Sequence, residues 1–201
     1  MGVLIMSEYA YTNNWTWIDS NKLESKSYTC YNCGRNISSN EGYVCNNASG
    51  YNSYTISIYI CHNCKRPTAF VFGEQIPGSP YGSSISHLSD ELNTAYEESR
   101  KCYSVGAYTS SVLYCRKILM HIACKEGAEE NKSFLFYINY LNDNNYIPPN
   151  GKDWVDKIRQ LGNEAAHKLE SKTKEDAELA LNFTSMLLKF IYEFPKLLEN
   201  N

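Results

Sequence analysis

Two stretches, Cys30-Tyr31-Asn32-Cys33-Gly34 and Cys61-His62-Asn63-Cys64, decide how the first part of this chain folds. Each is a C-x-x-C pair, and 27 residues separate Cys33 from Cys61. Two such pairs supply four thiolates, the number that a tetrahedral zinc ion takes in a closed structural site. A tight turn between paired ligands lets backbone N–H groups point at the sulfurs, and Gly34 eases the exit from the first turn. We therefore expect Cys30, Cys33, Cys61 and Cys64 to hold a structural Zn²⁺ ion.

Other interpretations of the cysteines stay open. The pairs could form disulfides or a redox C-x-x-C, although a reducing compartment disfavours the first and the absence of a βαβ pattern disfavours the second. Cys45 is either a substitute ligand or, as we expect, a small buried residue. His62 could compete as a ligand, but we expect it to be part of the turn. A four-thiolate site leaves no position for water, so the metal should not be catalytic.

The sequence around the pairs predicts a small β domain. Residues 54–60 alternate apolar and hydroxyl side chains, and residues 69–72 form a shorter apolar run, so both have strand character. A stretch rich in Pro, Gly and Ser follows at 77–84 and reads as a boundary. We predict an N-terminal segment over residues 1–86, with a zinc ribbon at about 28–74, and a helical domain over residues 87–201.

Helical periodicity dominates after residue 86. We predict helices at about 89–103, 107–125, 133–141 and 152–168, and a fifth that begins after Thr173 and ends near Pro195. Ser89 caps the first, and Asp176 completes a capping box with Thr173. On the second, an apolar residue recurs every three or four positions and predicts one buried stripe: Tyr108, Val112, Cys115, Leu119 and Ile122. Five helices with short connections indicate an antiparallel bundle. The predicted fold class is therefore mainly α, an antiparallel helical bundle preceded by a small β zinc ribbon.

Charge and hydropathy exclude some classes of protein. The chain has 201 residues, 19 basic and 22 acidic, for a formal charge of −3, so it is not a highly basic nucleic-acid coat. No segment approaches the roughly 20 apolar residues that span a bilayer, and the apolar start is too short for a signal peptide. We expect a soluble cytoplasmic protein with no membrane contact. Lys65-Arg66 is the basic pair that most favours contact with nucleic acid. Tyr28, Tyr31 and Tyr59 either stack on bases or, as we favour, pack around the metal.

The fourth predicted helix carries the only candidate catalytic residues. Arg159, Asn163 and His167 are spaced four apart and form one polar stripe. The buried face of the same helix is expected to consist of Trp154, Ile158, Leu161 and Ala165. A cation, an amide and an imidazole on one face could bind and cleave a phosphodiester, with His167 moving the proton and Arg159 stabilising the charged transition state. In the alternative interpretation Arg159 pairs with Asp156 or another carboxylate, and the other two tie helices together.

Further residues of the bundle are interpreted as structural. Cys102, Cys115 and Cys124 read as core or near-core thiols, and His121 reads as a structural histidine. Arg116 could face the same cleft as the polar stripe or the solvent.

The stretch from Ile158 to His167 resembles the signature of the bacterial domain-of-unknown-function 4145 family. The N-terminal C-x-x-C pairs, the Tyr-containing acidic helix at 90–98 and the Gly106-Ala107-Tyr108 start of the next helix fit the same resemblance, which covers roughly residues 30 to 192. That family looks related to the HEPN superfamily of helical bundles, so the resemblance implies a HEPN-like bundle.

Many HEPN proteins are dimers, and many are metal-independent ribonucleases of toxin–antitoxin and phage-defence systems. Their motif is an Arg, four to six residues and a His, whereas seven residues lie between Arg159 and His167 here. The resemblance thus implies a homodimer in a defence system, associated with RNA or DNA or with a partner protein. Two hypotheses follow: a HEPN-type ribonuclease using Arg159, Asn163 and His167, or a non-catalytic module that dimerises and uses the zinc ribbon for contacts.

Overall fold

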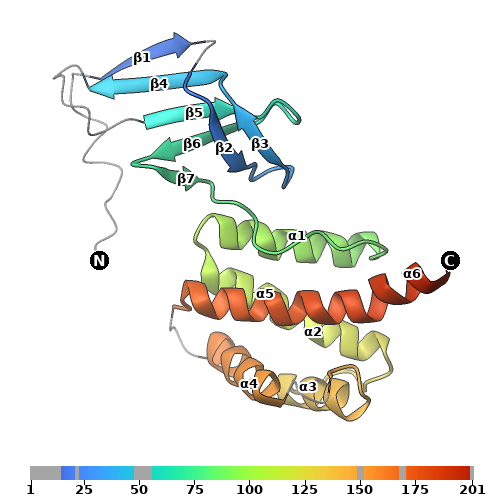
Figure 1. The fold of residues 1–201 in the computed structure, drawn as a ribbon. Coiled ribbons are helices and arrows are strands. Elements are labelled where there is room, and N and C mark those ends of the chain that lie inside the picture. Colours follow the sequence, from blue (N-terminus) through green and yellow to red (C-terminus); the bar gives the residue numbers. More distant parts are fainter. Residues whose placement is uncertain (1–14, 21–22, 48–55, 149–151, 168–170, 200–201) are drawn as a thin grey trace. The chain divides into compact units, whose positions relative to one another are not determined.

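The computed structural model describes residues 15–20, 23–47, 56–148, 152–167 and 171–199, with the backbone alone at 15–20, 46–47, 152–153, 162–167 and 198–199. The chain divides into two compact units, residues 1–79 and residues 80–201. In the described ranges the first unit contains strands and the second contains helices (Figure 1). The expected combination of a small β region with a larger helical part is confirmed.

The first unit contains two antiparallel sheets. A five-stranded sheet has the order β1-β4-β5-β6-β7, and β2 pairs with β3 in a two-stranded ribbon. The strands expected at 54–60 and 69–72 are confirmed as β5 and β6 over their described residues, whereas the other strands were not predicted. The bounds are β1 Trp15–Ser20, β2 Lys26–Thr29, β3 Asn36–Ser39, β4 Gly42–Asn47, β5 Ile56–Ile60, β6 Pro67–Val71 and β7 Glu74–Ile76.

Each cysteine pair lies in the turn of a hairpin. Cys30 and Cys33 lie between β2 and β3, and Cys61 and Cys64 lie between β5 and β6. Gly42 at the start of β4 lets the backbone of β5 approach closely, because a Cβ there would meet the Ile58 carbonyl oxygen at 1.9 Å. The close approach helps to place the two turns together.

A small aromatic core supports the two turns. Tyr28, Tyr59 and Phe70 are buried, with ring centroids 5.2 Å apart for Tyr28–Phe70 and 5.7 Å for Tyr59–Phe70. They form one cluster with Cys30 and Cys61. The interpretation that Tyr28 and Tyr59 pack near the metal position is therefore confirmed.

The second unit is helical, and its predicted helices are confirmed within a few residues, except for the end of the last one. Ser89 accepts a hydrogen bond from the Leu92 N–H, and Thr173 forms the expected capping box with Asp176. Gly127 follows the end of the second helix with φ +104. The bounds are α1 Asp90–Ser104, α2 Tyr108–Lys125, α3 Phe134–Asp143, α4 Lys152–His167, α5 Lys174–Leu188, η3 Lys189–Glu193 and α6 Phe194–Glu199.

Helix α2 is the centre of the helical unit, in contact with α1, α3, α4 and α5. Four residues of its expected apolar stripe are confirmed as buried, since Val112, Cys115, Leu119 and Ile122 are each at most 2% exposed. The fifth, Tyr108, is half-buried. Within the described ranges, no helix combines the length and the apolar character that crossing a bilayer requires.

The expected end of the last helix near Pro195 is wrong. After α5 the chain makes the π-helical turn η3 and then continues as α6 to Glu199. The Phe194 N–H bonds to the Lys189 carbonyl, five residues back. This wider turn places Pro195 in the first turn of a new α segment, where its missing N–H and its ring are tolerated.

The segment before α1 is fastened to the helices. Arg100, 6% exposed, donates to the Tyr81 and Gly82 carbonyl oxygens at 2.8 Å each and pairs with Glu97 at 2.6 Å. The Glu193 carboxylate accepts from the Ser86 N–H at 2.7 Å. These bonds explain why the segment from residue 80 belongs to the helical unit.

Candidate metal centre

The four cysteines of the two pairs lie together. The Sγ atoms of Cys30 and Cys64 are 3.7 Å apart, those of Cys33 and Cys61 are 3.8 Å apart, and all four lie within 4.8 Å of one another. A tetrahedron with Zn–S bonds of about 2.3 Å places its sulfurs about 3.8 Å apart. The four thiols are free, so this cluster has the donor atoms and the spacing that could hold a metal ion.

The two turns are built in the same way. The Cys30 N–H donates to the Arg35 carbonyl at 3.0 Å, and the Cys61 N–H donates to the Arg66 carbonyl at 3.0 Å. Gly34 and Lys65 occupy the same place in the two turns, with φ +65 and +59. A lysine therefore adopts a left-handed conformation that usually favours glycine. This equivalence brings the two pairs of sulfurs to one point from opposite hairpins.

Two asparagines cross between the turns. The Asn63 side chain hydrogen-bonds to Cys33 of the other turn, and the Asn32 side chain hydrogen-bonds to Cys64. Asn63 also accepts from Arg35 Nη1 at 2.8 Å, so its amide nitrogen is the donor to the sulfur. Neither asparagine was predicted from the sequence. Their signal was present, because Asn precedes the second cysteine in both pairs.

Hydrogen bonds act on the acidity of the thiols. Burial raises the pKa of Cys30 to about 12. At Cys33 the effect of burial is outweighed by hydrogen bonds from the Arg35 backbone and the Asn63 side chain, which lower its pKa to about 7. The pKa of Cys64 is also lowered, because bonds from the Arg66 backbone and Asn32 outweigh burial. The crossing amides thus favour the thiolate form that binds a metal.

The remaining cysteines lie outside this cluster. Cys45 on β4 is 2% exposed, which confirms the interpretation as a small buried residue. Cys115 is 1% exposed, and burial raises its pKa to about 11. Cys102 and Cys124 are half-buried, as expected of near-core thiols. Burial also raises the pKa of Cys45 and of Cys102, which disfavours their reactive thiolate forms.

The helix predicted to carry Arg159, Asn163 and His167 is present as α4. Of these three residues, only Arg159 has a described side chain. Arg159 Nη1 donates to Asp156 Oδ1 at 2.7 Å, and Nη2 donates to Asn139 Oδ1 of α3. The interpretation that Arg159 pairs with Asp156 is therefore confirmed. The side chains of Asn163 and His167 lie outside the described residues, so their part in the stripe stays a prediction.

Packing of α4 differs from expectation at one residue. Val155, Ile158 and Leu161 are buried, whereas Trp154, expected on the buried face, is 38% exposed. Its ring lies 6.3 Å from that of Phe183, so it covers the edge of the core instead of filling it. Ala165 was also expected on this face, but its side chain is outside the described residues.

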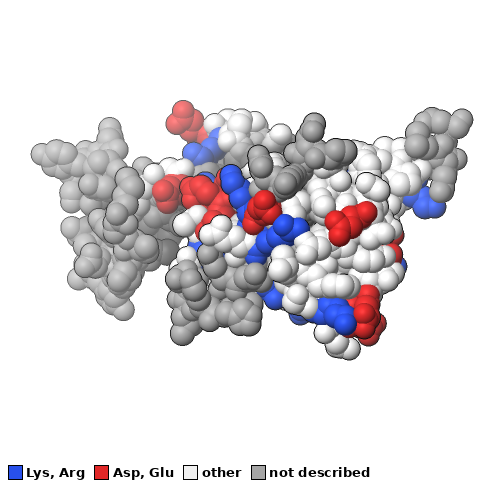
Figure 2. Space-filling model, turned by 90° about the horizontal axis from the view of Figure 1, so that it is seen from below, with Lys and Arg blue, Asp and Glu red and all other residues white. Residues whose placement is uncertain are grey.

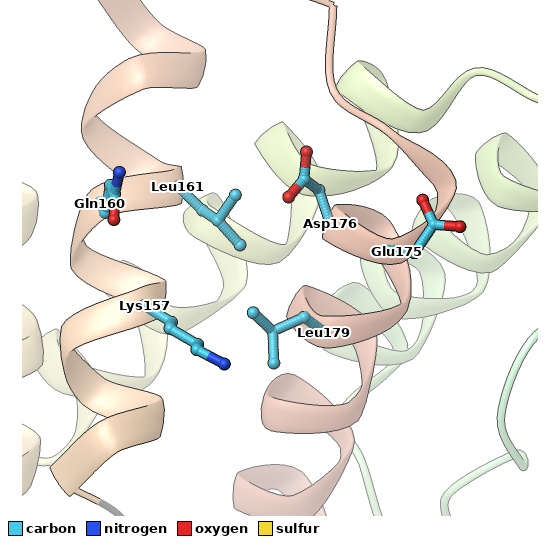
Figure 3. Close-up of a pocket in the computed structure, with 6 residues that line it drawn as sticks. All are labelled: Lys157, Gln160, Leu161, Glu175, Asp176 and Leu179. Atoms are coloured by element: carbon cyan, nitrogen blue, oxygen red, sulfur yellow. The ribbon is translucent and has the colours of Figure 1, made fainter.

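A hollow of about 410 Å³ lies between the facing residues of α4 and α5 (Figure 3). Leu161 of α4 and Leu179 of α5 point into the gap, and Lys157 extends toward Leu179. Glu175 and Asp176 line the other side from the first turn of α5. Asp176 is already used by the capping box. The described lining therefore offers one cation, one amide, two carboxylates and two leucines.

Two other polar residues of α2 were singled out from the sequence. The Arg116 guanidinium lies 4.6 Å from the centre of the Phe134 ring, and burial lowers its pKa. His121 is half-buried, with Nε2 shielded from water and without a hydrogen-bond partner among the described residues.

Comparison with known proteins identifies the helical unit. A family model described as Domain of unknown function (DUF4145) matches residues 97–200, from within α1 to beyond α6. No curated protein matches the chain, and no solved structure does. The matched range leaves out the four clustered cysteines, so the metal centre rests on its geometry alone.

Proposed function

The chain belongs to the DUF4145 family, and from this premise we propose that it is a non-catalytic, nucleic-acid-associated module whose β unit is stabilised by Zn²⁺. One observation carries the proposal: four sulfurs with tetrahedral spacing are presented by two turns of the same construction. A bound ion would link β2–β3 to β5–β6, whose shared core has only three aromatic rings. The metal would contribute folding free energy that so small a unit cannot obtain by burial.

The chemistry of the donor set favours zinc. Four thiolates in a closed tetrahedral site are typical of structural zinc, and no ligand position remains for water or substrate. When bound, the ion supplies a cross-link and no catalysis. Cys30, Cys33, Cys61 and Cys64 would hold it, and Asn32 and Asn63 would orient two of the sulfurs.

The contacts of Arg159 favour binding over cleavage. A ribonuclease of the HEPN type would need this guanidinium at the scissile phosphate, but two of its nitrogens are engaged by Asp156 and Asn139. Charges on the face shown in Figure 2 are mixed, with acidic and basic residues interspersed among uncharged ones. We therefore propose that the helical unit is a HEPN-like bundle that dimerises and acts as an assembly module in a bacterial defence system. Nucleic-acid contact is made by the β unit with its zinc site.

The test uses the purified full chain. Elemental analysis should find one zinc per chain, and anisotropy of a labelled RNA should report binding at low salt. The same RNA should remain intact over hours, with or without a chelator. A chain without metal, or one that binds neither RNA nor DNA, would refute the proposal. If RNA is cleaved, His167→Ala abolishes the cleavage and the control Asn40→Ala, at an exposed residue of the β unit, retains it, the ribonuclease hypothesis replaces the proposal.

A further inference from the structure

Three cations gather at the metal end of the β unit. Lys65 and Arg66 follow the second cysteine pair directly and are exposed. Arg35 comes from the first turn, but its Nη1 donates to Asn63 at 2.8 Å, so its guanidinium lies against the second turn. Within the described part of the chain, none of the three has an ion pair with a carboxylate. The fold thus adds Arg35 to the Lys65-Arg66 pair seen in the sequence.

A hollow lined by hydroxyl, amide and apolar side chains lies on the β2–β3 strands, next in the chain to Arg35. It measures about 590 Å³ and is open to solvent. Ser27 and Ser38 bond across the β2–β3 ribbon at 2.7 Å, and Thr29 donates to Asn36 at 2.6 Å. The residues that line the hollow are Ser27, Tyr28, Thr29, Asn36, Ile37, Ser38 and His62.

Arg35 connects the hollow with the cation group. Its chain neighbour Asn36 lines the hollow, and its side-chain partner Asn63 follows His62, which lines it from the second turn. His62 is exposed, so its imidazole offers a flat ring and hydrogen-bonding nitrogens. Hydroxyls, amides and a ring next to three cations match the groups of a nucleotide.

We infer that this surface, made of Arg35, Lys65, Arg66, His62 and the neighbouring hollow, binds single-stranded nucleic acid. The inference rests on the proposed function and adds the site and the strandedness of the ligand. Phosphates contact the cations, and a base stacks on His62 over the hydroxyl and amide groups of the hollow. A single strand fits because its bases can leave the stack and enter a hollow next to the backbone.

The charges set the expected strength. Three cations stand against the −2 charge of a four-thiolate zinc site, so the local excess is small. Two or three phosphate contacts with a single strand give a slope of log K against log salt of about −1.4 to −2.1. The expected binding is therefore weak and is lost as salt rises.

The experiment measures anisotropy of labelled twelve-nucleotide oligo-U and of a matched RNA duplex with the zinc-loaded full chain. The test variant is Lys65→Ala with Arg66→Ala. The control removes two exposed lysines of the helical unit, Lys101→Ala with Lys125→Ala. Zinc content and circular dichroism are recorded for each protein, so that loss of fold is separated from loss of binding. His62→Ala tests the stacking contact.

The surface is supported if the test variant weakens oligo-U binding at least tenfold and reduces the salt slope by about 1.4, while the control binds as wild type. It is overturned if the test variant binds as wild type, in which case the proposed function stands with another site. Preference for the duplex, or no effect of His62→Ala, also overturns it. If the wild type binds no nucleic acid, the proposed function itself fails.

Discussion

The crossing amides lead to a measurable prediction about metal retention. In Asn63→Ala the chain loses the amide that donates to Cys33 and accepts from Arg35 at 2.8 Å. A hydrogen bond to a charged group contributes about 1.5–3 kcal/mol. The lower end of this range applies to the Asn63–Cys33 hydrogen bond, because a bound metal ion withdraws part of the negative charge from the sulfur. About 1.5 kcal/mol corresponds to roughly a tenfold loss of zinc affinity, within the range of outer-shell effects at metal sites.

Two further variants make the prediction sharper. Asn63→Asp removes the donor and adds a negative charge beside the thiolate, so it should lose more affinity than Asn63→Ala. Asn32→Ala removes the equivalent bond to Cys64 and should cost about the same as Asn63→Ala. Because both bonds serve one cluster, the double variant should depart from simple additivity.

The assay follows zinc transfer from the full chain to a chromophoric chelator. Asn40→Ala is the matched control, since Asn40 is exposed and only its backbone carbonyl has a described bond, from the Leu23 N–H at 2.7 Å. Far-ultraviolet circular dichroism checks that each variant is folded. If Asn63→Ala and Asn40→Ala retain zinc equally well, the crossing amides do not stabilise the site and the reasoning fails.

Three more predictions concern the fold. Chelation of the metal should unfold the β unit and leave the helical circular dichroism in place, because the helices have their own core; loss of the helical signal would contradict this. Arg159→Ala should destabilise the helical unit by about 1–2 kcal/mol, since it breaks the bonds to Asp156 and Asn139, and denaturant unfolding that matches wild type would refute that role. Burial raises the pKa of Tyr96 to about 12, so the folded state keeps a proton that the unfolded chain releases near pH 10. Unfolding free energy should therefore fall as pH rises from 10 to 12, and Tyr96→Phe should flatten that slope; an unchanged slope would show that Tyr96 is not responsible.

Much of the fold could be predicted because its signals are local. The caps Ser89 and Thr173 and the apolar stripe of α2 act over three or four residues, and the structure has them as expected. The continuation of the last helix past Pro195 was not predicted. The π turn that accommodates the proline has no local sequence signal as strong as a cap residue or an apolar stripe.

The candidate site divides in the same way. The spacing within each C-x-x-C pair indicated a turn that could hold a metal ion, since both cysteines lie within four residues. Only the tertiary structure decided that Asn32 and Asn63 cross between the turns, that Arg35 joins Lys65 and Arg66, and that Arg159 is held by Asn139 of another helix. These contacts join residues about twenty or more positions apart, and their partners are fixed by how hairpins and helices pack rather than by any pattern along the chain.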